Sequence, residues 1–256
     1  MARVITDLAG LPRGFPLHVM THHGVVLEEA PLSCYSDPPY PVLVCRPAFV
    51  PLYGNRPDKP VIATGSIQIH YRRQRGITQA ADAAGTLAFP HHSTHHLASF
   101  FDQEAYADLL AGLLPPFQPV TVCLYWKDLL AGAHVPYLKR GLRVVSAGHI
   151  FDPNFTANFY AHLRRCRFAT GNTVGSQTLY ALEMGIPYFI SGDAPGMRVI
   201  RTGSGKYREQ DFPIGSHIPL DLSSRPIAAR LSSLLPRPET GLSISAELAA
   251  FVAYLH

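Results

Sequence analysis

The sequence has few charged residues, few cysteines and no long apolar run. Charged side chains make up 16% of the 256 residues and hydrophobic ones 47%, which excludes a disordered chain and predicts a substantial core. No apolar stretch approaches the roughly 20 residues of a membrane-spanning helix, and the first residues lack the apolar segment of a secretory signal. We therefore expect a cytoplasmic protein.

The cysteines argue against a zinc site or a disulfide framework, because the four of them form no Cys-x-x-Cys pair. Cys45 and Cys123 lie in short apolar runs, which predicts buried thiols on strands. Cys34 and Cys166 stand alone.

Positive charge is in slight excess, with a formal net charge of +4 and one short basic run at Tyr71–Arg75. This balance favours an anionic ligand, or peripheral contact with an acidic membrane surface, and argues against nucleic acid as a partner. A phosphate-binding loop of the Walker type is also excluded, because Gly203–Lys206 lacks both the required spacing and the final hydroxyl.

Strands and helices alternate along most of the chain, which predicts an α/β fold with a mostly parallel, doubly wound sheet. The strands are expected at 41–45, 60–64, 85–89, 120–125, 141–146, 168–170 and 186–190. The helices are expected within 67–84, at 101–114, 154–166 and 176–184, with a further helix starting at Leu97. Because Pro115 and Pro116 break the pattern, we predict two domains, 1–116 and 117–256.

The segment Arg167–Ile190 predicts a strand, a polar turn, a helix and a second strand. Its turn, Gly171–Ser176, brings free backbone N–H groups and two hydroxyls to a helix N-terminus, where anions bind well. Glu183 lies seven residues after Ser176 and therefore on nearly the same face of the helix. An ordinary βαβ crossover with a solvated Glu183 is the alternative.

This segment resembles the donor-binding half of GT-B-type glycosyltransferases, over roughly residues 119–212. In those enzymes a turn rich in Ser, Thr and Gly, a helix carrying Glu and a Gly-x-Pro step into a strand contact a nucleotide-sugar. The resemblance implies a GT-B-like fold whose N-terminal, acceptor-side half is shortened. It also implies a ribose contact from Glu183 and phosphate contacts from the turn, with the candidates Asn172, Thr173, Gly175 and Ser176.

A histidine-rich turn, Ala88–His96, follows another predicted strand, at the edge where open α/β sheets bind ligands. A histidine there can act as general base on an acceptor hydroxyl. We favour His92 with Ser93 as the catalytic pair, because His95 and His96 are expected to begin the helix at Leu97. His91, Thr94 and His95 are candidate substrate contacts. This turn also resembles the corresponding segment of some bacterial surface-polysaccharide transferases.

Other interpretations of this turn stay open. The spacing of His91 and His95, and that of His92 and His96, would allow a metal if the segment were helical, but no nearby Asp or Glu completes a ligand set. Ser93 or Thr94 can also cap a helix, and the histidines can be plain surface residues.

A third cluster follows two further strands at the same edge. Lys127 is a candidate for neutralising a leaving diphosphate, and Asp128 is a candidate catalytic acid or base. Tyr125, Gly148 and His149 are candidate contacts to the base or phosphates.

Taken together, these features predict a glycosyltransferase that moves a sugar from a nucleotide-sugar to a surface-glycan or lipid-linked acceptor. We expect an inverting reaction without metal or other cofactor, since no Asp-x-Asp pair is present. A sugar-nucleotide epimerase-like enzyme and a non-catalytic nucleotide-binding subunit are the alternatives.

Overall fold

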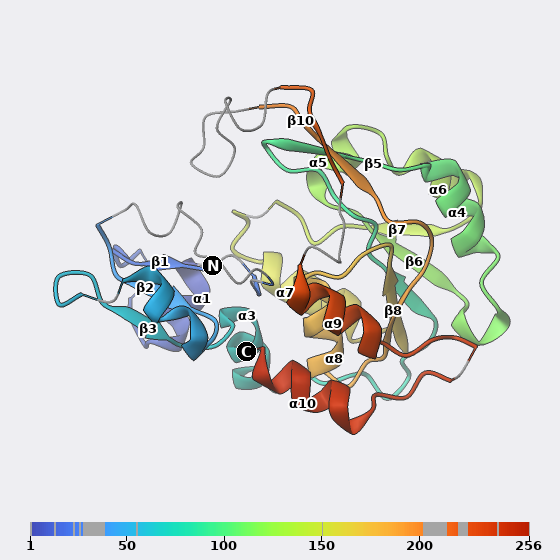
Figure 1. Cartoon of the computed structure of the whole chain (residues 1–256). Coiled ribbons are helices and arrows are strands. Elements are labelled where there is room, and N and C mark those ends of the chain that lie inside the picture. Colours follow the sequence, from blue (N-terminus) through green and yellow to red (C-terminus); the bar gives the residue numbers. More distant parts are fainter. Residues whose placement is uncertain are drawn as a thin grey trace.

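The structure is a computed structural model (Figure 1). It describes residues 2–255 except 13, 23, 26, 28–38, 55, 150, 202–213, 220–224 and 240. Cys34 and Gly203–Lys206 lie outside the described residues. The predicted α/β class and mostly parallel pairing are confirmed, in two parallel sheets and a small antiparallel one.

The larger sheet has five parallel strands in the order β7-β6-β4-β8-β9. Their bounds are β4 Thr86–Ala88, β6 Val120–Cys123, β7 Arg143–Val145, β8 Phe168–Gly171 and β9 Tyr188–Ile190. From β4 the chain first adds β6 and β7 on one side and then β8 and β9 on the other. The strand order therefore reverses between β4 and β8, and the crevice at such a switch point is where open α/β sheets bind ligands.

Helices cover both faces of this sheet, so the predicted double winding is present. Side chains alternate between the faces: Ala88 packs with α4 and α6, and Leu87 packs with α7 and α8. The helices on this sheet are α4 Gln103–Ala111, α5 Trp126–Leu130, α6 Val135–Lys139, α7 Phe155–Leu163 and α8 Ser176–Glu183, and the short 3₁₀ turn η3 spans Pro115–Phe117.

The βαβ unit predicted at Arg167–Ile190 is confirmed as β8, α8 and β9. Gly185 follows the C-cap of α8 with φ 78°, a left-handed conformation that glycine adopts without strain. Gly171 is required for a different reason: a Cβ there would lie 2.3 Å from the Tyr188 hydroxyl and 2.6 Å from the Phe89 carbonyl oxygen. Backbone and ring thus approach closely where β8 enters the turn.

The smaller parallel sheet lies beside the five-stranded one (Figure 1) and shares its core. Its strands are β1 Met20–Thr21, β2 Val42–Val44 and β3 Val61–Ala63, followed by α3 Ile67–Gln74, with α1 Ala2–Leu8 and the 3₁₀ turns η1 Pro47–Phe49 and η2 Pro51–Tyr53 nearby. The C-terminal helices, α9 Pro226–Leu234 and α10 Ala246–Tyr254, join the same core. The side chains of Cys45, Cys123 and Cys166 are buried, as expected for the first two.

The five-stranded sheet crosses the boundary predicted near residue 116. Because β4 pairs with β6 on one side and β8 on the other, residues 86–88 belong with the C-terminal half. In chain order the two parallel sheets are separated between β3 and β4. The proline pair at 115–116 lies in η3, a connection within the second sheet.

The helix predicted to start at Leu97 is wrong, because Leu97–Phe100 forms strand β5. This strand pairs antiparallel with β10 Gly196–Val199, which in turn pairs with β11 His217–Pro219. Pairing with a distant strand overrides local helix propensity here. The next helix begins at Gln103, where the Asp102 side chain caps α4 by accepting from the Ala105 N–H.

Within the described part of the chain, no helix combines the length and the apolar character needed to cross a membrane.

Candidate functional site

Two polar turns meet at the switch point, one after β4 and one after β8. The His91 backbone N–H donates to Asn172 Oδ1 at 2.8 Å and joins them directly. Asn172 is only 2% exposed, and its amide nitrogen has no hydrogen-bond partner among the described residues. A buried donor without a partner is costly in a folded protein, so a ligand oxygen or a water is expected to complete it.

The turn before α8 uses several of its predicted phosphate contacts for its own structure. The Thr173 carbonyl accepts from the Tyr188 hydroxyl at 2.9 Å, and the Gly175 N–H donates to Thr178 Oγ1 at 3.1 Å. Ser176 Oγ accepts from the Val25 N–H at 2.9 Å, which brings the N-terminal segment against the start of α8. The Ser176 hydroxyl hydrogen is still able to donate, because that contact uses only the oxygen.

His92 is exposed in the turn after β4, and its ring lies 4.6 Å from that of Tyr125. Its Nδ1 is 3.0 Å from the Ser93 carbonyl oxygen. Because a carbonyl only accepts, this contact places the hydrogen of a neutral ring on Nδ1 and leaves the Nε2 lone pair available. The arrangement suits the predicted role of His92 as a base, which stays a prediction.

Helix α5 holds the histidine turn in place through its two charged residues. The Asp128 carboxylate accepts from the Ser93 N–H at 3.1 and 3.3 Å, and the Lys127 ammonium donates to the Thr94 carbonyl. Ser93 Oγ accepts from the Ser99 N–H at 3.1 Å. These contacts give Lys127, Asp128 and Ser93 a positioning role, different from the catalytic and phosphate-binding roles predicted for them.

His91 is held in its neutral form. Burial lowers its pKa to about 3, and the charges of His92 and Arg225 act in the same direction. Its Nδ1 lies 2.7 Å from Ser99 Oγ. Arg225, the residue before α9, is therefore near enough for its charge to act on His91. Sequence reasoning missed this residue, because nothing in its local pattern links it to the histidine turn 134 positions earlier.

We expect His91 to weaken the fold in mild acid. In the unfolded chain His91 binds a proton below pH 6.5, whereas in the folded protein its pKa is about 3. The free energy of unfolding therefore falls as the pH drops through this window. The contribution is about 1.4 kcal/mol per pH unit, or about 2 kcal/mol between pH 6.5 and 5. Urea unfolding at a series of pH values measures it. The slope should be shallower in His91→Asn, whereas the two proteins should run parallel above pH 7; equal slopes below pH 6.5 would contradict the assignment.

Glu183 forms ion pairs with two arginines of α3. Its side chain is 5% exposed, and its two oxygens accept from Arg72 Nε and Nη2 at 2.6 Å each, with Arg73 Nε at 2.9 Å. This bidentate pair ties α8 to α3. The geometry therefore favours a structural role for Glu183 over the predicted ribose contact.

The third predicted cluster is gathered at the same edge of the sheet. Tyr125 and Trp126 follow β6, while Gly148 and His149 follow β7. Gly148 sits in a left-handed turn with φ 94°, and its N–H donates to Ser146 Oγ at 3.1 Å. The exposed ring of His95 lies 6.3 Å from that of Trp126. These residues therefore lie at the ends of β6 and β7, on the side of the switch point away from α8.

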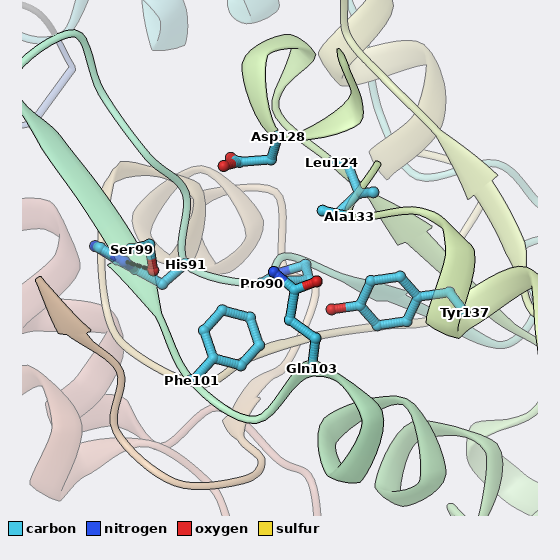
Figure 2. A pocket seen from close by; sticks show the side chains of 9 residues that line it. All are labelled: Pro90, His91, Ser99, Phe101, Gln103, Leu124, Asp128, Ala133 and Tyr137. Carbon is cyan, nitrogen blue, oxygen red and sulfur yellow. Dashed lines mark hydrogen bonds between the residues drawn. The ribbon is translucent and has the colours of Figure 1, made fainter. Parts of the chain in front are cut away.

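Beneath the histidine turn lies a cavity of about 10 Å³, room for one water molecule (Figure 2). The side chains of Asp128, Gln103 and Tyr137 project around it. The Tyr137 hydroxyl is buried without a hydrogen-bond partner among the described residues, so an ordered water is expected there. A second cavity, of about 170 Å³, lies between Phe49 and Tyr254. Neither has the several hundred Å³ of a typical ligand pocket.

Across the described residues, no group of three or more His, Cys, Asp or Glu side chains is arranged to hold a metal ion. The sequence matches no protein-family model and no curated protein.

Proposed function

We propose that the protein is a glycosyltransferase that binds the diphosphate of a nucleotide-sugar in the crevice between β4 and β8. One observation carries the proposal: the buried Asn172 amide nitrogen, at the switch point of a parallel sheet, has no hydrogen-bond partner in the described part of the chain. The N-terminus of α8 and the nearby charge of Arg225 favour an anion at the same place.

The proposed reaction is a direct displacement. Nε2 of His92 takes the proton of an acceptor hydroxyl as its oxygen attacks the anomeric carbon of the donor sugar. The bond from that carbon to the diphosphate oxygen breaks, and the diphosphate leaves with the electron pair. Attack from the face opposite the diphosphate inverts the anomeric centre. Asn172, Arg225 and α8 stabilise the negative charge on the leaving group, so the proposal requires no metal.

The acceptor in this proposal is a glycan or lipid-linked sugar hydroxyl. A non-catalytic nucleotide-binding subunit is the second candidate, because Lys127 and Asp128 are engaged in holding the turn. Release of free nucleotide from nucleotide-sugars separates the two: slow hydrolysis supports the transferase, and binding without any turnover supports the subunit.

The variant Asn172→Asp tests the diphosphate site. It keeps an oxygen to accept from the His91 N–H, but it removes the amide donor and adds a negative charge. We expect the affinity for uridine or adenosine diphosphate, measured by calorimetry, to fall at least about tenfold, the size of one hydrogen bond to a charged group.

Asn154→Asp is the matched control, since it adds the same charge at the exposed start of α7. It should leave the affinity unaltered. Equal binding by Asn172→Asp and the wild type, or a failure of the wild type to bind any nucleoside diphosphate, would refute the proposed site.

A further inference from the structure

Aromatic rings line the sheet edge next to the proposed diphosphate site. Trp126 follows β6, and its ring lies 4.3 Å from the imidazole of His149, which follows β7. Phe151 continues the row at 5.2 Å from His149. On the other side, Tyr125 lies 5.8 Å from Trp126 and 4.6 Å from His92 of the histidine turn. The row therefore runs from the catalytic candidate outward along the strand ends.

Phe151 and Trp126 give this row an apolar ring surface. Phe151 is 83% exposed, which is unusual for a phenylalanine in a folded protein. Trp126 is partly exposed, yet its indole nitrogen is buried. Its exposed part is therefore carbon, which suits stacking better than hydrogen bonding.

The distance to the diphosphate site suits a nucleotide. Neighbouring strands in a sheet lie about 4.8 Å apart. The crevice lies between β4 and β8, and Trp126 and His149 come from the ends of β6 and β7, so the two places are about two strand spacings, roughly 10 Å, apart. A ribose and one phosphate bridge a gap of this order.

We propose that the ring row of Trp126, His149 and Phe151 is the subsite that stacks the base of the nucleotide. The inference rests on the proposed function, because it takes the diphosphate to lie in the crevice between β4 and β8. It extends that function by assigning base binding to the ends of β6 and β7, on the side of the crevice away from α8. Stacking recognises the flat ring of any base, so uridine and adenosine diphosphates should both gain from it.

Trp126 is the only tryptophan of the chain, which makes it a direct reporter. We expect uridine diphosphate and adenosine diphosphate to change its fluorescence on titration. Inorganic pyrophosphate, which has no base, should bind in calorimetry and leave the fluorescence nearly unchanged.

The variants Trp126→Leu and Phe151→Ala measure the contribution of stacking. Each should weaken nucleoside diphosphate binding in calorimetry about 5- to 100-fold and leave pyrophosphate affinity unaltered. Phe151 is so exposed that its replacement leaves the fold intact. Leu130→Ala, which removes an apolar side chain 79% exposed on the same α5 helix, is the control and should change neither affinity.

The outcomes separate this inference from the proposed function. If nucleotides and pyrophosphate bind but Trp126→Leu and Phe151→Ala bind them as the wild type does, the base subsite is wrong and the diphosphate site stands. If the wild type binds neither, the proposed function falls and this inference falls with it. If the variants lose pyrophosphate as well, the rings support the crevice and do not hold the base, which also overturns the inference.

Discussion

His92→Asn is expected to lower the turnover of sugar transfer by about 10²–10⁴-fold with the donor affinity nearly unchanged. General-base catalysis contributes on this scale and acts in the transition state. The side chain is exposed and contacts the rest of the protein mainly through Tyr125 and the Ser93 carbonyl, so the variant should fold normally. Steady-state kinetics with a nucleotide-sugar, together with calorimetry of the nucleoside diphosphate, separate rate from binding.

Other roles of His92 give other results. If the ring holds the donor phosphates, donor affinity should fall together with turnover. If it binds a metal, a chelator should abolish activity, and added zinc or manganese should restore it. Full activity of the variant with an unaltered pH profile would remove this turn from the active site.

Glu183→Gln is expected to lower the free energy of unfolding by about 3–5 kcal/mol. The carboxylate is 5% exposed and Arg72 is 13% exposed, so the change leaves a buried guanidinium without its counter-charge. Urea unfolding measures the loss. Glu247→Gln is the matched control, since it breaks a pair with Arg230 whose side chains are both more than 60% exposed and should cost little.

The same variant tests the ribose contact that the sequence predicts. If the stability of Glu183→Gln is close to that of the wild type while nucleotide affinity falls, the carboxylate serves the ligand and the structural role is wrong. A large loss of stability with unaltered affinity, measured below the unfolding transition, supports the structural role.

Local chain properties determined the elements around α8. The order of Phe168–Gly171, Ser176–Glu183 and Tyr188–Ile190 follows from apolar spacing and from Gly185, signals that lie within a few residues of each other. The same holds for β2, β3, β4, β6 and β7, each of which was expected within one or two residues. Such signals depend on the residues themselves, so they are present before the chain folds.

Pairing over long distances was decided only by the tertiary structure. Leu97–Phe100 is a strand because β10, almost 100 residues later, supplies its hydrogen bonds. Strand β4 belongs to the five-stranded sheet because it pairs with β6 and β8. In the sequence, Pro115 and Pro116 suggest instead a domain boundary between β4 and β6. The residues of a strand do not by themselves determine which other strand it pairs with.

The site divides in the same way. The sequence by itself placed the polar turns at strand ends, because polar and glycine-rich segments after apolar runs mark the edge of a parallel sheet. Only the tertiary structure showed that the two turns touch, through His91 and Asn172, 81 residues apart. It also showed that Glu183 pairs with Arg72, 111 residues away, and that the charge of Arg225 acts on His91. Charged side chains interact according to their distance in space, so these contacts exist only once the sheet has assembled.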